Sequence, residues 1–177
     1  AVGVSAAEQP GAADVTGMDE PSRRGNGAGR PERYRRATSN PLGMLTPAVV
    51  NSRAWRAAEV PAINGHGTAR GVAGFYAALL EGKVLSADLL QEATRPHCSG
   101  VDAVFGSENS WGLGFGVDED GYGMGGLGGS VGWTRKAGGY AFAFVSGTTG
   151  SHVPGVQVGT ALRAGRGRPS IEAAPAP

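Results

Sequence analysis

One glycine-rich segment, between Gly121 and Val145, constrains the fold of this chain more than any other feature. Its sequence is GYGMGGLGGSVGWTRKAGGYAFAFV, in which closely spaced glycines are followed by alternating small and apolar residues. Such alternation is typical of β-strands, and residues without a Cβ allow another group to approach the backbone N–H closely. The segment therefore predicts strands, one of which has an accessible backbone.

The composition of the whole chain predicts one domain with a small hydrophobic core. The chain has 177 residues, a length suited to one domain, and 32 of them are glycine, well above the roughly 7% of average proteins. The formal net charge of +1 provides no global attraction to nucleic acid or to an anionic membrane. Cys98 is the only cysteine, which excludes an internal disulfide and a multi-cysteine metal site. We therefore expect no cofactor, no metal, no nucleic-acid partner and no membrane partner.

Composition also divides the chain into three parts. Residues 1–45 are rich in Gly, Ala, Pro, Ser and Arg and lack apolar periodicity, which predicts a low-complexity, disordered or loosely packed segment. Similar features predict a flexible tail over residues 149–177, so the organised domain is expected over residues 46–148. No apolar run approaches the ~20 residues of a membrane helix and no signal peptide is visible, which favours a cytoplasmic location. Because the chain begins at Ala1 without a methionine, we expect it to be processed or to be a piece of a longer protein.

The first half of the organised region predicts three helices. Thr46 is the expected N-cap of a short helix that starts at Pro47, within TPAVVNSRAWRAAE. Thr68 caps a helix through ARGVAGFYAALLEG, whose apolar residues follow the i, i+3, i+4 pattern and which ends at Gly82. Ser86 caps the third helix.

The second half predicts antiparallel strands. Residues 111–117 alternate large residues with glycine, and residues 131–135 and 140–145 form two further strands joined by a short turn. Helices followed by an antiparallel meander predict an α+β fold.

Three segments, taken together, carry a family resemblance. They are residues 51–96 (NSRAWRAAEVPAINGHGTARGVAGFYAALLEGKVLSADLLQEATRP), residues 111–115 (WGLGF) and residues 121–133 (GYGMGGLGGSVGW). In this order they resemble the C-terminal half of the serine β-lactamase and penicillin-binding-protein superfamily, most closely its class C-like esterase branch. The resemblance implies a partial β-lactamase/transpeptidase-like fold over about residues 47–148. It also implies acyl transfer on a small-molecule ester or amide in a full-length parent.

The resemblance assigns a substrate-binding role to the glycine strand. The family carries a Lys-Thr-Gly, His-Thr-Gly or His-Gly-Gly motif there, which corresponds to Met124, Gly125 and Gly126, and the following N–H, that of Leu127, would bind the oxyanion. Such a donor is worth about 3 kcal/mol to the tetrahedral intermediate. Met124 departs from the motif because a thioether carries no charge and donates no proton. This argues against a potent β-lactamase more than against an esterase.

The nucleophile of the family is absent from this chain. The family uses Ser-x-x-Lys, in which the lysine takes the serine proton, but the only lysines here, Lys83 and Lys136, follow Leu80 and Trp133 by three residues. Tyr34, in TyrArgArgAla, is a poor match to the family's tyrosine motif. The resemblance therefore implies a C-terminal fragment that has no catalytic nucleophile or base and is inactive alone. The alternative is a non-catalytic remnant or binding module of the same fold.

Several polar residues are better explained by structural roles. His66 is expected in the loop that leads into the second helix, and His152 lies in the predicted tail. Cys98, beside His97, is expected to be a passive thiol in a loop, because no helix N-terminus lies behind it. Ser130 is expected to be a strand hydroxyl, because no base accompanies it.

Other patterns also favour simple interpretations. Residues 118–120 (Asp-Glu-Asp) are expected to form a solvated turn, and the arginines between residues 23 and 36 a solvated linker. Residues 123–128 fit G-x-G-x-x-G, but a strand is expected after them instead of the helix that a dinucleotide site requires. Trp111 and Trp133 are expected to be core or cleft-wall aromatics.

Overall fold

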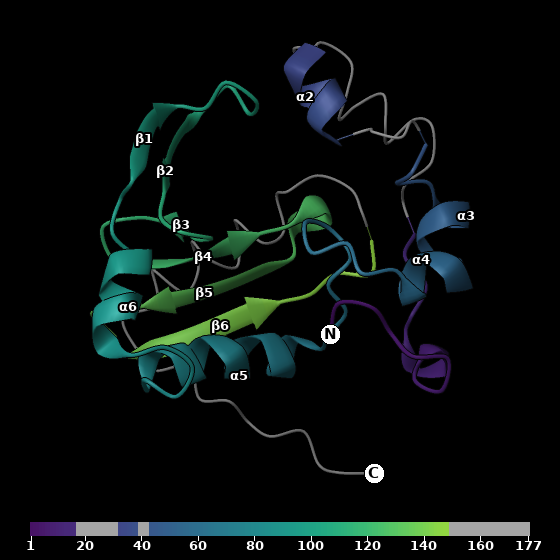
Figure 1. Cartoon of the computed structure of the whole chain (residues 1–177), viewed down its shortest axis with the longest axis horizontal. Coiled ribbons are helices and arrows are strands. Elements are labelled where there is room, and N and C mark those ends of the chain that lie inside the picture. Colours follow the sequence, from purple (N-terminus) through teal and green to yellow (C-terminus); the bar gives the residue numbers. More distant parts are fainter. Residues whose placement is uncertain (17–31, 39–42, 149–177) are drawn as a thin grey trace.

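The protein combines short helices with one antiparallel sheet, which confirms the predicted α+β class (Figure 1). The computed structural model describes residues 1–16, 32–38 and 43–148. Six strands form a sheet in sequence order, β1-β2-β3-β4-β5-β6, with every neighbouring pair antiparallel. The strands are β1 Cys98–Val101, β2 Glu108–Trp111, β3 Gly116–Val117, β4 Gly121–Gly125, β5 Val131–Arg135 and β6 Tyr140–Phe144. The helices are η1 Gln9–Gly11, α2 Glu32–Thr38, α3 Pro47–Val50, α4 Arg53–Ala57, α5 Ala69–Leu80, α6 Ala87–Ala93 and η2 Leu127–Gly129.

The predicted caps of the second and third helices are confirmed. The Thr68 hydroxyl accepts the Gly71 N–H at 3.1 Å and begins α5, and the Ser86 hydroxyl accepts the Leu89 N–H at 3.3 Å and begins α6. Gly82 follows α5 with φ +68°, the left-handed conformation in which glycine is favoured. These ends were predictable because each depends on side chains within one helical turn.

The first predicted helix is instead two short helices, α3 and α4. The chain breaks at Ser52, which has an extended conformation and caps α4 by accepting the Trp55 N–H at 3.1 Å. The preceding Asn51 pairs with the backbone of Val15 through its side-chain oxygen, at 2.8 Å, and nitrogen, at 2.9 Å. These contacts from a distant segment favour the break.

Two strand predictions were wrong. Residues 111–117 do not form one strand, because the chain turns between β2 and β3, where Gly114 has φ +85° and the Leu113 N–H donates to the Ala93 carbonyl at 2.8 Å. Cys98 lies in a strand, β1, not in a loop, and is exposed there. By contrast, β5 has the predicted limits and β6 ends one residue early.

The core lies between α5 and one face of the sheet. Helix α5 lies along the sheet beside β5 and β6 (Figure 1), and Tyr76, Leu79 and Tyr122 are buried together at this interface. Burial raises the pKa of both tyrosines. A Cβ at Gly132 would meet the rings and methyl groups of Tyr76 and Val72, so glycine permits close packing of α5 on β5. The sheet is therefore covered by a helix on this face.

The N-terminal segment makes more contacts than its composition predicted. Val2 bridges to Gly65, and the Val4 N–H donates to the Arg56 carbonyl at 2.6 Å. Arg56 also forms an ion pair with Asp14 at 2.6 Å. These contacts differ from the expected loose packing of residues 1–45, while the domain limits at residues 45 and 148 stay predictions.

Helices long and apolar enough to cross a membrane do not occur in the described ranges.

Candidate functional site

The glycine strand β4 lies in a cross-strand row that begins and ends with tryptophan. Trp111 pairs with Gly116, Gly116 with Gly123, and Gly123 with Trp133. Directly opposed residues of antiparallel strands point to the same face of a sheet. The two indoles therefore share one face with the two glycines between them.

The glycines at the start of β4 make room for the Trp133 indole. A Cβ at Gly123 would lie 2.6 Å from Trp133 Cε3 and would also meet the Gly132 carbonyl oxygen. A Cβ at Gly121 would lie 2.9 Å from Trp133 Nε1, and one at Gly116 would lie 3.6 Å from both indoles. The Trp133 indole therefore fills the space over Gly121 and Gly123, and we call this part of β4 the closed half of the strand.

The end of β4, formed by Met124 and Gly125, is the open half of the strand. A Cβ at Gly125 would meet no atom within 4 Å, and one at Gly126 would make only ordinary contacts with Ser130. Met124, at the same end, is 42% exposed. Gly125 thus offers free space on its face of the strand, whereas the Tyr76 phenol of α5 contacts the Met124 backbone.

A tight turn follows and places the Leu127 backbone. Gly128 and Gly129 have φ values of 82° and 84°, which favour glycine, and the Gly126 N–H donates to the Ser130 carbonyl at 2.7 Å. Leu127 is the first residue of η2, a position whose N–H has no acceptor within its own helix. Such an N–H at the end of an open strand can donate to a developing negative charge.

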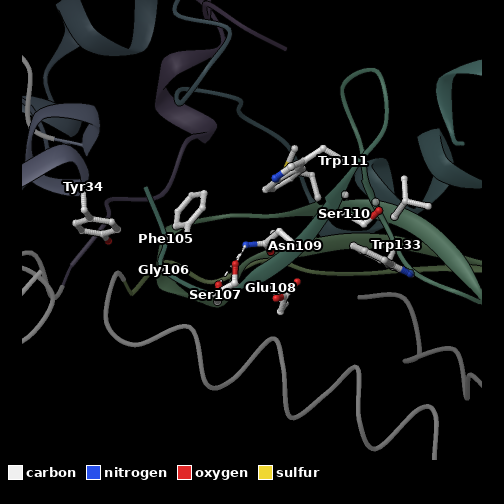
Figure 2. A pocket seen from close by; sticks show the side chains of 14 residues that line it. Tyr34, Phe105, Gly106, Ser107, Glu108, Asn109, Ser110, Trp111 and Trp133 are labelled. Atoms are coloured by element: carbon white, nitrogen blue, oxygen red, sulfur yellow. Dashed lines mark hydrogen bonds between the residues drawn. The ribbon is translucent and has the colours of Figure 1, made fainter. Parts of the chain in front are cut away.

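A groove of about 670 Å³ lies beside this strand end, and Met124 and Gly125 line it. Aromatic residues form much of its remaining wall, as Figure 2 shows for Tyr34, Phe105, Trp111 and Trp133. The expectation that both tryptophans are core or cleft-wall residues is borne out. The sequence analysis considered Tyr34 only as a poor match to the tyrosine motif, and it missed Phe105, a single aromatic residue in a segment without apolar periodicity.

The position of Trp111 depends on Asp102. The Trp111 Nε1–H donates to one Asp102 carboxylate oxygen at 3.2 Å, and the other oxygen accepts the N–H groups of Val104 and Phe105 at 2.7 and 2.9 Å. The hydrogen bonds from Phe105 and Val104, with a smaller contribution from Trp111, hold the pKa of Asp102 below its ordinary value. Asp102 therefore fixes both the turn between β1 and β2 and one wall of the groove.

The acidic turn at residues 118–120 is not simply solvated, which corrects the prediction. Both Asp118 carboxylate oxygens accept from Arg135 Nη1 at 3.0 Å, and Asp120 lies 3.7 Å from the same nitrogen. The Arg135 guanidinium is buried and lies 5.9 Å from the centre of the Trp133 ring. Arg135 pairs with Gly121 across the two strands, so this ion pair stabilises the start of β4, within the closed half.

Other candidate residues have structural partners. The Ser130 hydroxyl accepts the Ser146 N–H at 3.1 Å, and the His66 backbone exchanges hydrogen bonds with Ala1. Lys83 pairs with Glu81 at 2.5 Å, and Lys136 lies over the Tyr122 ring. Among the residues that the structure describes, none of these side chains is joined to another as a nucleophile and its base.

The remaining sequence candidates add no further site. Within the described ranges, no group of three or more His, Cys, Asp or Glu side chains could hold a metal ion. The G-x-G-x-x-G sequence ends within η2 and is followed by β5, not by the α-helix of a dinucleotide site. In the basic run, Arg33 and Arg36 are exposed on α2, whereas Arg23, Arg24 and Arg30 lie outside the described residues, as does His152.

Comparisons with known proteins agree with this architecture. The model of the beta-lactamase family matches residues 1–165. A family VIII carboxylesterase of known structure is similar over 92% of this chain and 46% of its own, with 28% identity and a TM-score of 0.75. A search of curated proteins found no match.

Two further solved structures share the fold at lower identity. EstA from Arthrobacter nitroguajacolicus Rue61a has 21% identity and a TM-score of 0.76, over 92% of this chain and 48% of its own. A penicillin-binding-protein homologue from Caulobacter crescentus has 24% identity and a TM-score of 0.58, over 84% of this chain and 42% of its own. The chain thus spans about half the length of the structures it resembles.

Proposed function

Because this chain belongs to the beta-lactamase family, we propose that it is the C-terminal part of a serine hydrolase that acts on esters. It supplies one wall of the cleft and one oxyanion N–H. The nucleophile and its base come from a Ser-x-x-Lys motif outside this chain. The coverage of just under half of the family VIII carboxylesterase and of EstA supports this division.

The open end of β4 is the observation that carries the proposal. Gly121 and Gly123 are covered by Trp133, whereas a Cβ at Gly125 would meet nothing within 4 Å. The open stretch therefore leaves room for a ligand beside the Leu127 N–H. In serine acyl transfer, the serine oxygen attacks the substrate carbonyl carbon and the carbonyl oxygen becomes an oxyanion. A preplaced N–H stabilises that oxyanion by about 3 kcal/mol.

Met124 favours an ester substrate without a carboxylate. The thioether carries no charge, so this position offers no cation to a β-lactam carboxylate. An ester carbonyl needs only the nucleophile and the oxyanion donor. We therefore propose esterase activity over β-lactamase activity for the assembled enzyme.

The proposal predicts that the isolated chain has no serine hydrolase activity. The test is incubation with a fluorophosphonate probe and a chromogenic ester, followed by mass spectrometry. We expect an unlabelled chain and no turnover above buffer. A phosphonylated serine, at Ser130 or elsewhere, would show that the nucleophile is present and would contradict the proposal.

A second function, a non-catalytic remnant or binding module of the same fold, is favoured by Met124 and by the glycine-rich composition of the chain's ends. It predicts that the chain still lacks turnover when a Ser-x-x-Lys half is supplied, either fused or as a separate polypeptide. Ester hydrolysis by that assembly would exclude it.

A further inference from the structure

Four aromatic rings line the groove beside the open strand end. Tyr34 and Phe105 are in edge contact with ring centres 6.2 Å apart, and the ring centres of Phe105 and Trp111 are 6.5 Å apart. Trp111 and Trp133 each lie 3.6 Å from the Cβ position of Gly116, so the two indoles approach each other above that glycine. Figure 2 shows these four side chains along the groove. Flat π surfaces of this kind favour a flat partner.

The described residues that line this groove carry one formal charge, and it is negative. The exposed Arg33 and Arg36 lie on α2 on either side of Tyr34 but do not line the groove. Glu108 is the only lining residue among those described that carries a formal charge at neutral pH. The Asp102 carboxylate binds the Trp111 Nε1–H at 3.2 Å, which places a second negative charge beside these rings. The Arg135 guanidinium lies beside Trp133 but is ion-paired with Asp118. An anionic group held among the lining side chains would therefore lose its hydration without gaining a cation from them.

Met124 is a neutral residue close in sequence to the proposed oxyanion donor, the Leu127 N–H. It lines the groove and is 42% exposed, so a ligand that reaches the open strand end passes a neutral, polarisable thioether. Thioethers make favourable contacts with aromatic rings.

We propose that this groove binds a flat, uncharged aryl group of the ester and disfavours a carboxylate. The inference rests on the proposed function only in that the bound group belongs to the substrate. Binding itself requires no nucleophile, so it is testable on this chain alone.

Three ligands of similar size separate the effects of charge and flatness. Benzamide is the neutral flat probe, benzoate is its anionic counterpart, and cyclohexanecarboxamide is neutral but not flat. Each is titrated into the ¹⁵N-labelled full chain at millimolar concentrations, and the indole N–H signals are followed. Trp55, which does not line the groove, is the internal control.

We expect saturable shifts of the Trp111 and Trp133 signals but not of the Trp55 signal. Benzamide should bind about threefold to tenfold more tightly than benzoate, because the described lining residues include the Glu108 carboxylate and no cation. It should bind about threefold more tightly than cyclohexanecarboxamide, because of the aromatic surfaces. Benzoate binding equal to or tighter than that of benzamide, or no saturable shift with any ligand, would overturn the inference.

Met124→Lys and its neutral control Met124→Leu test the anion selectivity. The exposed position accommodates either side chain. The lysine variant should raise benzoate affinity about fivefold and change benzamide affinity less than about twofold, and the leucine variant should leave the order unchanged. A lysine variant that does not gain benzoate affinity would contradict the role of Met124. Failure of the esterase proposal would appear as an assembled enzyme without turnover, with this binding order intact.

Discussion

The two halves of the glycine strand have nearly the same composition but opposite surroundings. At Gly121 and Gly123, a Cβ would collide with the backbone of β5 and with the Trp133 indole, whereas at Gly125 it would meet nothing within 4 Å. The first half needs glycine because the protein packs on it, and the second half leaves space for something else. Glycine density alone therefore does not mark a ligand site; the neighbours of each glycine do.

The largest difference in stability is expected between an alanine substitution in the closed half and one in the open half. Gly123→Ala forces a Cβ against the Gly132 carbonyl and the Trp133 ring, so we expect a loss of about 3 kcal/mol in the free energy of unfolding. Gly125→Ala should change it by less than about 0.5 kcal/mol. Urea denaturation followed by circular dichroism measures both. Equal effects of the two substitutions would remove the distinction between the halves.

A smaller effect should follow from removing the ion pair beside the closed half. Asp118→Asn leaves the buried Arg135 guanidinium without its bidentate carboxylate. Because Asp118 is about a third exposed, solvent screens the pair and we expect a loss of about 1–2 kcal/mol. Glu119→Gln, in the same turn, is the matched control and should have little effect. If both substitutions behave alike in urea denaturation, the ion pair does not support the strand.

The smallest effect concerns the groove wall beside the open half. The pKa of Asp102 is lowered from its ordinary 3.8, so its hydrogen bonds stabilise the turn fully above that pH and are lost as the pH falls through the lowered value. We expect the Trp111 indole N–H signal to move below pH 3.8 in the folded protein. In Asp102→Asn the signal should no longer titrate. A Trp111 signal that titrates identically in that variant would exclude Asp102 as the cause.

The sequence predicted the features that depend on neighbouring residues. Caps at Thr68 and Ser86, the left-handed Gly82 and the limits of β5 follow from local patterns, and all are confirmed. The family resemblance, carried by three ordered segments, is also confirmed.

Features that depend on distant contacts were not predictable. The break between β2 and β3 involves a hydrogen bond to the Ala93 carbonyl, and the groove combines Tyr34 with Phe105, which lie far apart in the sequence. The pairing of Asp118 with Arg135 likewise requires the β4–β5 hairpin. The site at residues 124–127 stays a prediction, because glycine spacing shows where a backbone is accessible and not what approaches it.

Deleting the Leu127 N–H tests whether this group binds the oxyanion. Leu127→Pro removes the donor, and the extended Gly126 before it, with φ −120° and ψ 168°, suits a residue that precedes proline. Leu127→Ala keeps the donor and is the control. Ester hydrolysis should be measured in an assembled enzyme that includes a Ser-x-x-Lys half. We expect kcat to fall about 10²–10³-fold in the proline variant alone. Equal kcat values in the two variants would exclude the Leu127 N–H as the oxyanion donor.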